Sequence, residues 1–243
     1  MTETTDAAAP RGFFQDLTDL YFDPREAFAG ILRVPRLAAA ILGWLALGLL
    51  FTAVWMNKVE PREFFKTQME EGGQWQKMSV EQRTAVLDAQ ARFFPIIGWV
   101  GATVGPIVFL MVTSAVLMFV YRFFYASEVT FSRALAIVAW TFLALGLIAT
   151  PLMLLVMGLK GDWNVAPQDA LQANPTLFLD RSDTAKWLWA LLGSLDLFSF
   201  WHVFLLAAGF GVASKRSTGS AVWGVAVCWG ILVLGKVAFA LFQ

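Results

Sequence analysis

The sequence has little of the chemistry that most soluble functional sites use. It contains one cysteine and one histidine, too few for a disulfide framework or for a structural zinc site, which needs about four such ligands. Its 18 basic and 18 acidic residues cancel, so no positive surplus is available to pair with nucleic-acid phosphates. Only 15% of the residues are charged, against about 25% in an average soluble domain. A soluble enzyme, a metal protein and a nucleic-acid-binding protein are all poor fits.

Catalytic motifs are also missing. There is no G-x-S-x-G, H-E-x-x-H or G-x-G-x-x-G pattern, so the sequence offers no nucleophile elbow, zincin helix or dinucleotide-binding turn. Gly230, Gly235 and Lys236 have the spacing of a P-loop, but Val237 stands where that motif needs a serine or threonine to bind the magnesium ion. We therefore expect no catalytic residues, no metal site and no cofactor.

Apolar residues dominate what is present. They make up 58% of the 243-residue chain, whose mean hydropathy is +0.63. Five stretches reach the roughly 20 residues that a helix needs to cross the hydrocarbon of a bilayer. We therefore predict an all-α polytopic membrane helix bundle, with an arm over 1–36 and a membrane domain over 37–243. The predicted spans are about 37–57, 95–121, 133–158, 186–212 and 220–242.

Two segments outside these spans also have helical patterns. Residues 12–22 place apolar side chains at helical spacing between Gln15, Asp16 and Asp19, which predicts an amphipathic helix on the membrane surface. A helix that simply packs against the end of the bundle fits the same pattern. Ser79-Val-Glu-Gln82 is a capping box and predicts a helix in the long segment before the second span.

The basic residues of the short connections predict the orientation. With five spans, these connections face one side, which the positive-inside rule assigns to the cytoplasm. The N-terminus is then cytoplasmic and the C-terminus outside. The basic residues concerned are Arg33, Arg36, Arg122, Arg133, Lys215 and Arg216.

Asp196 and Lys236 are ionisable residues within the predicted fourth and fifth spans. A charge near the centre of a bilayer costs at least about 2.5–3.5 kcal/mol, so it is normally paired or faces water. The tight turn Ser214-Lys215-Arg216-Ser217 joins the two spans, so we expect them to form an antiparallel hairpin. Both residues then lie at a similar depth, and we predict an ion pair or a shared aqueous pocket. Ser199 shares a helix face with Asp196, whereas His202 is turned about 120° away. A proton or ion relay and a purely structural pair both fit these positions.

Small residues are spaced for close helix packing. Gly101 and Gly105 form a G-x-x-x-G pattern, and Gly224 and Gly230 belong to small-x-x-x-small pairs with Ser220 and Ala226. Such spacing lets helix backbones approach closely. It serves packing within the bundle or self-association, and packing within the bundle is the more frequent use.

Several ordered motifs together resemble bacterial members of the Yip (Ypt/Rab-interacting protein) family. The resemblance runs from about residue 20 to the C-terminus and rests on the order and spacing of the motifs. The motifs are Pro24-Arg-Glu-Ala-Phe28, Arg33-Val-Pro-Arg36, Ser79-Val-Glu-Gln-Arg83, Phe131-Ser132, Asn174-Pro175 and Leu192-Gly-Ser-Leu-Asp-Leu-Phe-Ser-Phe-Trp201.

This resemblance implies five spans, a cytosolic N-terminus and residence in a bacterial inner membrane. Asn174, Pro175 and Asp196 are the family-signature positions that it carries over, without a role attached. Eukaryotic relatives act in vesicle traffic, bind small GTPases and form oligomers. The arm of about 36 residues is shorter than the cytosolic domains of those relatives, so a GTPase partner is not carried over.

Two functions remain open at this point. The first is a non-enzymatic scaffold or adaptor that contacts the lipid bilayer and binds partner membrane proteins or itself. The alternative is a small transporter or channel for an ion, a proton or a lipid, using Asp196 and Lys236. No nucleic-acid partner is expected for either.

Overall fold

The computed structural model describes residues 12–181 and 183–242, so the first part of the predicted arm lies outside the described residues. Within them, every regular element is helical, which confirms the all-α prediction. The order is α1 (Phe13–Phe22), α2 (Pro24–Ile31), α3 (Leu37–Met56), α4 (Pro61–Glu71), η1 (Trp75–Lys77), α5 (Val80–Phe124), α6 (Phe131–Lys160), α7 (Pro167–Ala170), η2 (Pro175–Phe178), α8 (Lys186–Ser194), α9 (Leu197–Ala213) and α10 (Thr218–Leu241).

Four helices are each long and apolar enough to cross a membrane: α3, α5, α6 and α10. The predicted fourth span is instead two helices, α8 and α9, bent by 48° at a short break. The described residues therefore hold four continuous candidate spans, or five if the bent pair counts as one. α5 starts earlier than the predicted second span, because the Ser79 capping box opens it and neither Pro95 nor Pro106 ends it.

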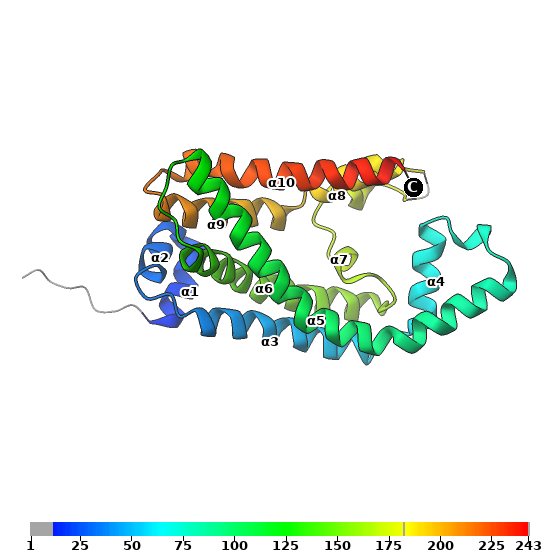
Figure 1. Ribbon diagram of the computed structural model, residues 1–243. Helices are drawn as coiled ribbons and strands as arrows, with labels where there is room; N and C mark the ends of the chain where they lie inside the picture. Colours follow the sequence, from blue (N-terminus) through cyan, green and yellow to red (C-terminus); the bar gives the residue numbers. More distant parts are fainter. Residues whose placement is uncertain (1–11, 182, 243) are drawn as a thin grey trace, which may run out of the picture.

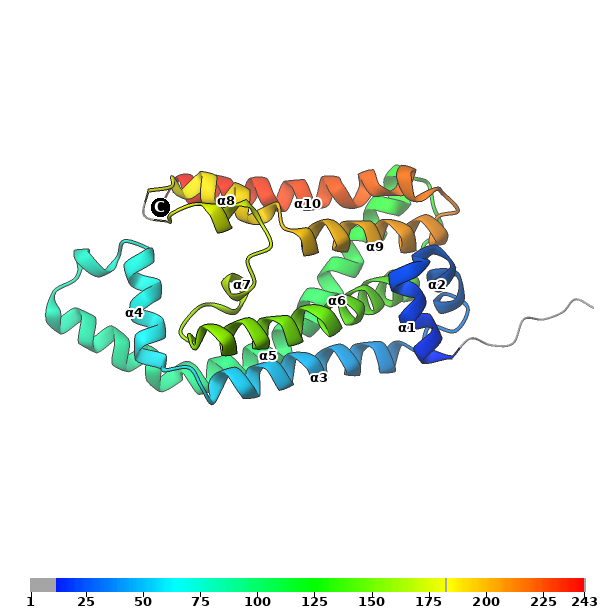
Figure 2. The same ribbon diagram turned by 180° about the vertical axis from the view of Figure 1, so that it is seen from behind.

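α6 is the central helix of the bundle. In both views it lies between α3 on one side and the α9–α10 hairpin on the other, while α5 crosses the bundle diagonally (Figures 1 and 2). The helix half nearer its N-terminus is almost completely buried, including Ile137 and Trp140. The α9–α10 hairpin closes at a short turn in which Lys215 has a φ of 57°. The tightest packing therefore lies at the end of the molecule that holds this turn.

α1 and α2 cover that same end of the bundle (Figure 1). Leu20, Phe28 and Ile31 are fully buried against it, and the Tyr21 hydroxyl donates a hydrogen bond of 2.6 Å to the Ala144 carbonyl of α6. Burial raises the pKa of Tyr21, so the phenol stays protonated and remains a donor. α1 is therefore a packing helix on one face, which confirms that interpretation of residues 12–22.

The opposite face of α1 is strongly exposed. Phe14 is 77% exposed and Phe22 is 87% exposed, as expected for side chains that enter the membrane surface. Contact of this face with lipid stays a prediction.

The long segment between α3 and the apolar part of α5 is helical, as predicted. α4 packs beside the first turns of α5, and Arg62 forms an ion pair with Asp88 across them. A second cluster of buried apolar residues, including Trp55 and Phe94, joins this segment to the ends of α3 and α6. The segment is therefore a structured extension of α5 beyond the main core.

Candidate functional site

The break between α8 and α9 gives Asp196 a structural position. Asp196 is the N-cap of α9, and its carboxylate accepts a hydrogen bond of 2.8 Å from the Phe198 amide. The apolar run 186–212 predicts a continuous helix with Asp196 inside it, where an unpaired charge would be costly. Because the helix restarts at Leu197, Asp196 instead satisfies one of the free amides of a helix N-terminus.

Asn174 and Pro175 lie beside this break. The Asn174 side chain caps η2 by accepting a hydrogen bond of 3.1 Å from the Thr176 amide, and Pro175 occupies the first position of that helix. The preceding carbonyl, of Ala173, accepts a 3.1 Å hydrogen bond from the Leu197 amide. The structure therefore brings the three family-signature positions of the sequence analysis to one place, where a loop supports the broken helix.

Lys236 lies elsewhere and forms no ion pair with Asp196. It lines a cavity of about 1080 Å³ between α10, α8, the end of α4 and the segment before α8. The predicted pair is wrong because 186–212 is not one straight helix but the bent pair α8–α9. The bend turns the carboxylate of Asp196 toward the backbone of its own helix. We call the cavity that Lys236 lines the polar basin.

Ser199 and His202 line a second cavity, of about 370 Å³, between α5 and α10. The His202 ring contacts Phe142 edge-on at 4.7 Å between ring centroids. Its Nε2 atom is buried and has no hydrogen-bond partner within the described part of the chain. The other lining residues are almost all apolar and include Cys228. We call this cavity the lateral groove.

The glycines divide into packed and open positions. A methyl group on Gly224 would lie 3.1–3.3 Å from the rings of Tyr121 and Tyr125, so this glycine packs within the bundle as predicted. Gly101, Gly105 and Gly230 have no other part of the protein within 4 Å of a methyl group placed there. Packing within the bundle is therefore the wrong interpretation for the G-x-x-x-G pattern of α5, which faces outward.

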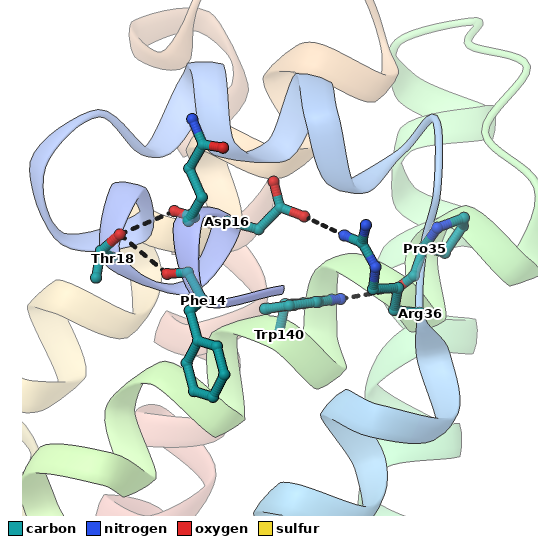
Figure 3. A network of polar contacts seen from close by, with 7 residues as sticks. Phe14, Asp16, Thr18, Pro35, Arg36 and Trp140 are labelled. Atoms are coloured by element: carbon teal, nitrogen blue, oxygen red, sulfur yellow. Dashed lines mark hydrogen bonds and ion pairs between the residues drawn. The ribbon is translucent and has the colours of Figure 1, made fainter. Parts of the chain in front are cut away.

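A buried ion pair at the N-terminal end was missed by the sequence analysis. Arg36 Nη1 lies 2.8 Å from Asp16 Oδ2, and the Asp16 side chain is only 1% exposed. Beside them, the Trp140 indole donates a hydrogen bond of 2.8 Å to the Pro35 carbonyl (Figure 3). These contacts tie α1 and the start of α3 to α6. The sequence does contain a signal for the burial of Asp16. It lies on the same helix face as the apolar residues Phe13 and Leu20.

No group of three or more His, Cys, Asp or Glu side chains that could hold a metal ion is found within residues 12–181 and 183–242. The polar residues that the sequence analysis selected are instead distributed over the helix break, the lateral groove and the polar basin. Capping, hydrogen bonding and the binding of an amphiphilic ligand are the chemistry that this arrangement supports.

The chain can be assigned to a known protein family. The model of the Yip1 domain matches residues 18–239, from the second half of α1 almost to the end of α10. The chain belongs to the Yip1 domain family. No curated protein and no solved structure gives a significant match.

Membership places the helix break, the groove and the basin inside the Yip1 domain. The resemblance found in the sequence is confirmed for the family, and the apolar helices identify an integral membrane protein. The bacterial origin, the inner membrane and the orientation of the termini stay predictions.

Proposed function

We propose that this Yip1 domain is a non-enzymatic membrane scaffold that binds a transmembrane helix of a partner protein, or of a second copy, through the outward face of α5. The observation that carries the proposal is the open G-x-x-x-G pattern. Gly101 and Gly105 have nothing within 4 Å on that face. Their neighbours Ile97, Val104 and Val108 are 66%, 54% and 54% exposed.

Lipid chains are as apolar as leucine, so helices in a bilayer associate mainly through close packing. A face of two glycines flanked by β-branched side chains permits such an approach, because a second backbone can sit against the glycines. α5 has 45 residues, which corresponds to about 68 Å of helix. This is more than twice the roughly 30 Å of hydrocarbon, so α5 also reaches partners outside the membrane.

The test is to fill this face without disturbing the bundle. The double variant Gly101→Leu/Gly105→Leu is compared with Gly48→Leu, a matched glycine of α3 that also has nothing within 4 Å. Cross-linking in native membranes followed by mass spectrometry measures the partners. We expect the double variant to lose its cross-linked partner, whether a second copy or another protein, while Gly48→Leu keeps it. An unchanged cross-linking pattern in the double variant would contradict the proposal.

The transport hypothesis is tested by one substitution at the helix break. Asparagine caps helices about as well as aspartate, so Asp196→Asn removes the charge and keeps the cap. A scaffold predicts no ion or proton flux in liposomes containing the purified wild-type protein. Flux in the wild type that falls in Asp196→Asn would favour the transporter or channel instead. The capping role of Asp196 and the position of Lys236 in the polar basin, which Asp196 does not line, support the scaffold.

We further propose a bacterial inner membrane location with the N-terminus in the cytoplasm and the C-terminus outside. In support, α1, α2, the α5–α6 connection and the α9–α10 turn all lie at one end of the molecule (Figures 1 and 2). Arg25 donates a hydrogen bond of 3.1 Å to the Arg216 carbonyl at this end. Reporter fusions at each terminus measure the orientation, and an external N-terminus would refute it.

A further inference from the structure

The polar basin carries balanced charge at one end of α10. Three carboxylates and three cationic side chains line it, together with the apolar side chains of Trp189 and Phe239. A ligand of one charge sign would meet as many repelling as attracting groups there, whereas a zwitterion meets a partner for each of its charges. The charged residues are Glu70, Glu71, Asp180, Arg181, Lys186 and Lys236.

Two of these charges have no partner of their own. The side chains of Lys236 on α10 and Glu70 on α4 make no hydrogen bond or ion pair with the rest of the described chain. Arg181 is already oriented, since its guanidinium lies 4.8 Å from the centroid of the Trp189 ring and its Nε lies 3.8 Å from Glu71 Oε2. Lys236 and Arg181 are the cations that would bind a phosphate in this cavity, and Glu70 is the carboxylate that would bind an ammonium group.

The lateral groove and the polar basin share one face of α10. Cys228 and Leu232 line the groove, while Lys236 and Phe239 line the basin. Their spacing of four, four and three residues places them in one stripe along the helix. A single ligand can therefore bind along this stripe of α10, with its apolar part in the lateral groove and its polar part in the polar basin.

The length of this stripe matches one leaflet of a bilayer. Val225 is the groove-lining residue of α10 farthest from Lys236, and eleven residues of helix separate them by about 16 Å. Half of the hydrocarbon core is about 15 Å. The exposed Val112 and Leu232 border the groove, so an acyl chain can enter it sideways from the bilayer.

We propose that the domain binds one zwitterionic phospholipid, with its phosphate and ammonium groups in the polar basin and an acyl chain in the lateral groove. The occupant is a lipid rather than a soluble phosphoethanolamine, because only a lipid fills both cavities. The site is separate from the glycine face of α5 and does not depend on the scaffold function.

The experiment uses the full-length protein in detergent micelles and measures the thermal shift and affinity on adding phosphatidylethanolamine. Lys236→Gln and Glu70→Gln remove the two unpartnered charges. Lys58→Gln is the matched control, because Lys58 is an exposed lysine outside both cavities. We expect Lys236→Gln to weaken binding by about tenfold or more, as for a lost charge-assisted hydrogen bond, and Lys58→Gln to bind as the wild type does.

Three further comparisons locate the two parts of the ligand. Leu232→Trp, which fills the groove, weakens binding of the lipid but leaves any weak binding of soluble phosphoethanolamine unchanged. Equal shifts from phosphatidylglycerol and phosphatidylethanolamine would overturn the assignment of the ammonium group. Equal shifts from soluble phosphoethanolamine and the lipid would overturn the role of the groove. Absence of lipid binding by the wild type, or equal effects of Lys236→Gln and Lys58→Gln, would overturn the proposal itself.

Discussion

Replacing Asp16 with alanine removes the buried half of the ion pair that joins α1 to α3. The Asp16 carboxylate is 1% exposed, and the Arg36 side chain that it pairs with is 27% exposed. Arg36 also has a left-handed backbone, with φ of 41°, a conformation that is unfavourable for a residue with a side chain. The Asp16 contact therefore holds both a charge and a strained turn in place.

The expected loss follows from these exposures. Breaking a fully buried ion pair by removing one partner costs about 3–5 kcal/mol, and breaking an exposed pair costs about 0–1 kcal/mol. Because Arg36 keeps partial access to solvent, we expect Asp16→Ala to lower the free energy of unfolding by about 2–3 kcal/mol. For a chain of this size, that corresponds to a decrease in Tm of roughly 4–12 °C.

Thermal unfolding of the purified protein in detergent measures this effect. The control is the double variant Asp16→Leu/Arg36→Met, which removes both charges and keeps apolar volume in their place. We expect the double variant to be more stable than Asp16→Ala, because it leaves neither charge of the pair at the partly buried site. A Tm of Asp16→Ala within 1 °C of the wild type, or a double variant no more stable than the single one, would refute this reasoning.

Three other substitutions are expected to change stability in the same unfolding assay. Gly209→Ala places a methyl group 2.5 Å from Ile137 Cγ2 and should lower the free energy of unfolding by about 1–3 kcal/mol through overpacking. Gly101→Ala, in open space, should leave the stability of the bundle unchanged. Equal effects of the two variants would contradict the close packing at Gly209. Tyr121→Phe removes the hydrogen bond that the phenol donates to the Ala221 carbonyl of α10. It should cost about 0.5–1.5 kcal/mol, since this carbonyl also lies within the hydrogen-bonded helix, and an unchanged Tm would contradict this. Asp196→Ala removes the cap of α9 and should cost about 1 kcal/mol, while Asp196→Asn should stay near the wild type.

Local sequence patterns predicted the helical elements well. The capping box at Ser79 acts over one helical turn, and the structure contains it as expected. The long apolar runs predicted α3, α6 and α10 nearly to their observed ends. The family resemblance also came from the chain itself and is confirmed. These features depend on neighbours within a few residues, so the sequence contains the necessary information.

The candidate site depended on contacts that local patterns do not specify. The length of the apolar run 186–212 fits one straight span as well as the bent pair α8–α9. What distinguishes them is two hydrogen bonds at the break, which the Ala173 carbonyl and the Asp196 carboxylate accept from amides of α9. The burial of Asp16 likewise depends on Arg36, which follows it by 20 residues.

By itself, the sequence determined that this protein is a bundle of membrane helices of the Yip1 family. Hydropathy, spacing and end-capping residues are local properties, and a helix forms from them before it meets its neighbours. Only the tertiary structure decided that Gly101 faces outward while Gly224 packs against tyrosine rings, and that Lys236 lies in the polar basin. Within a bilayer every helix face is apolar, so hydropathy cannot distinguish a face that meets protein from one that meets lipid. Packing between helices makes that distinction.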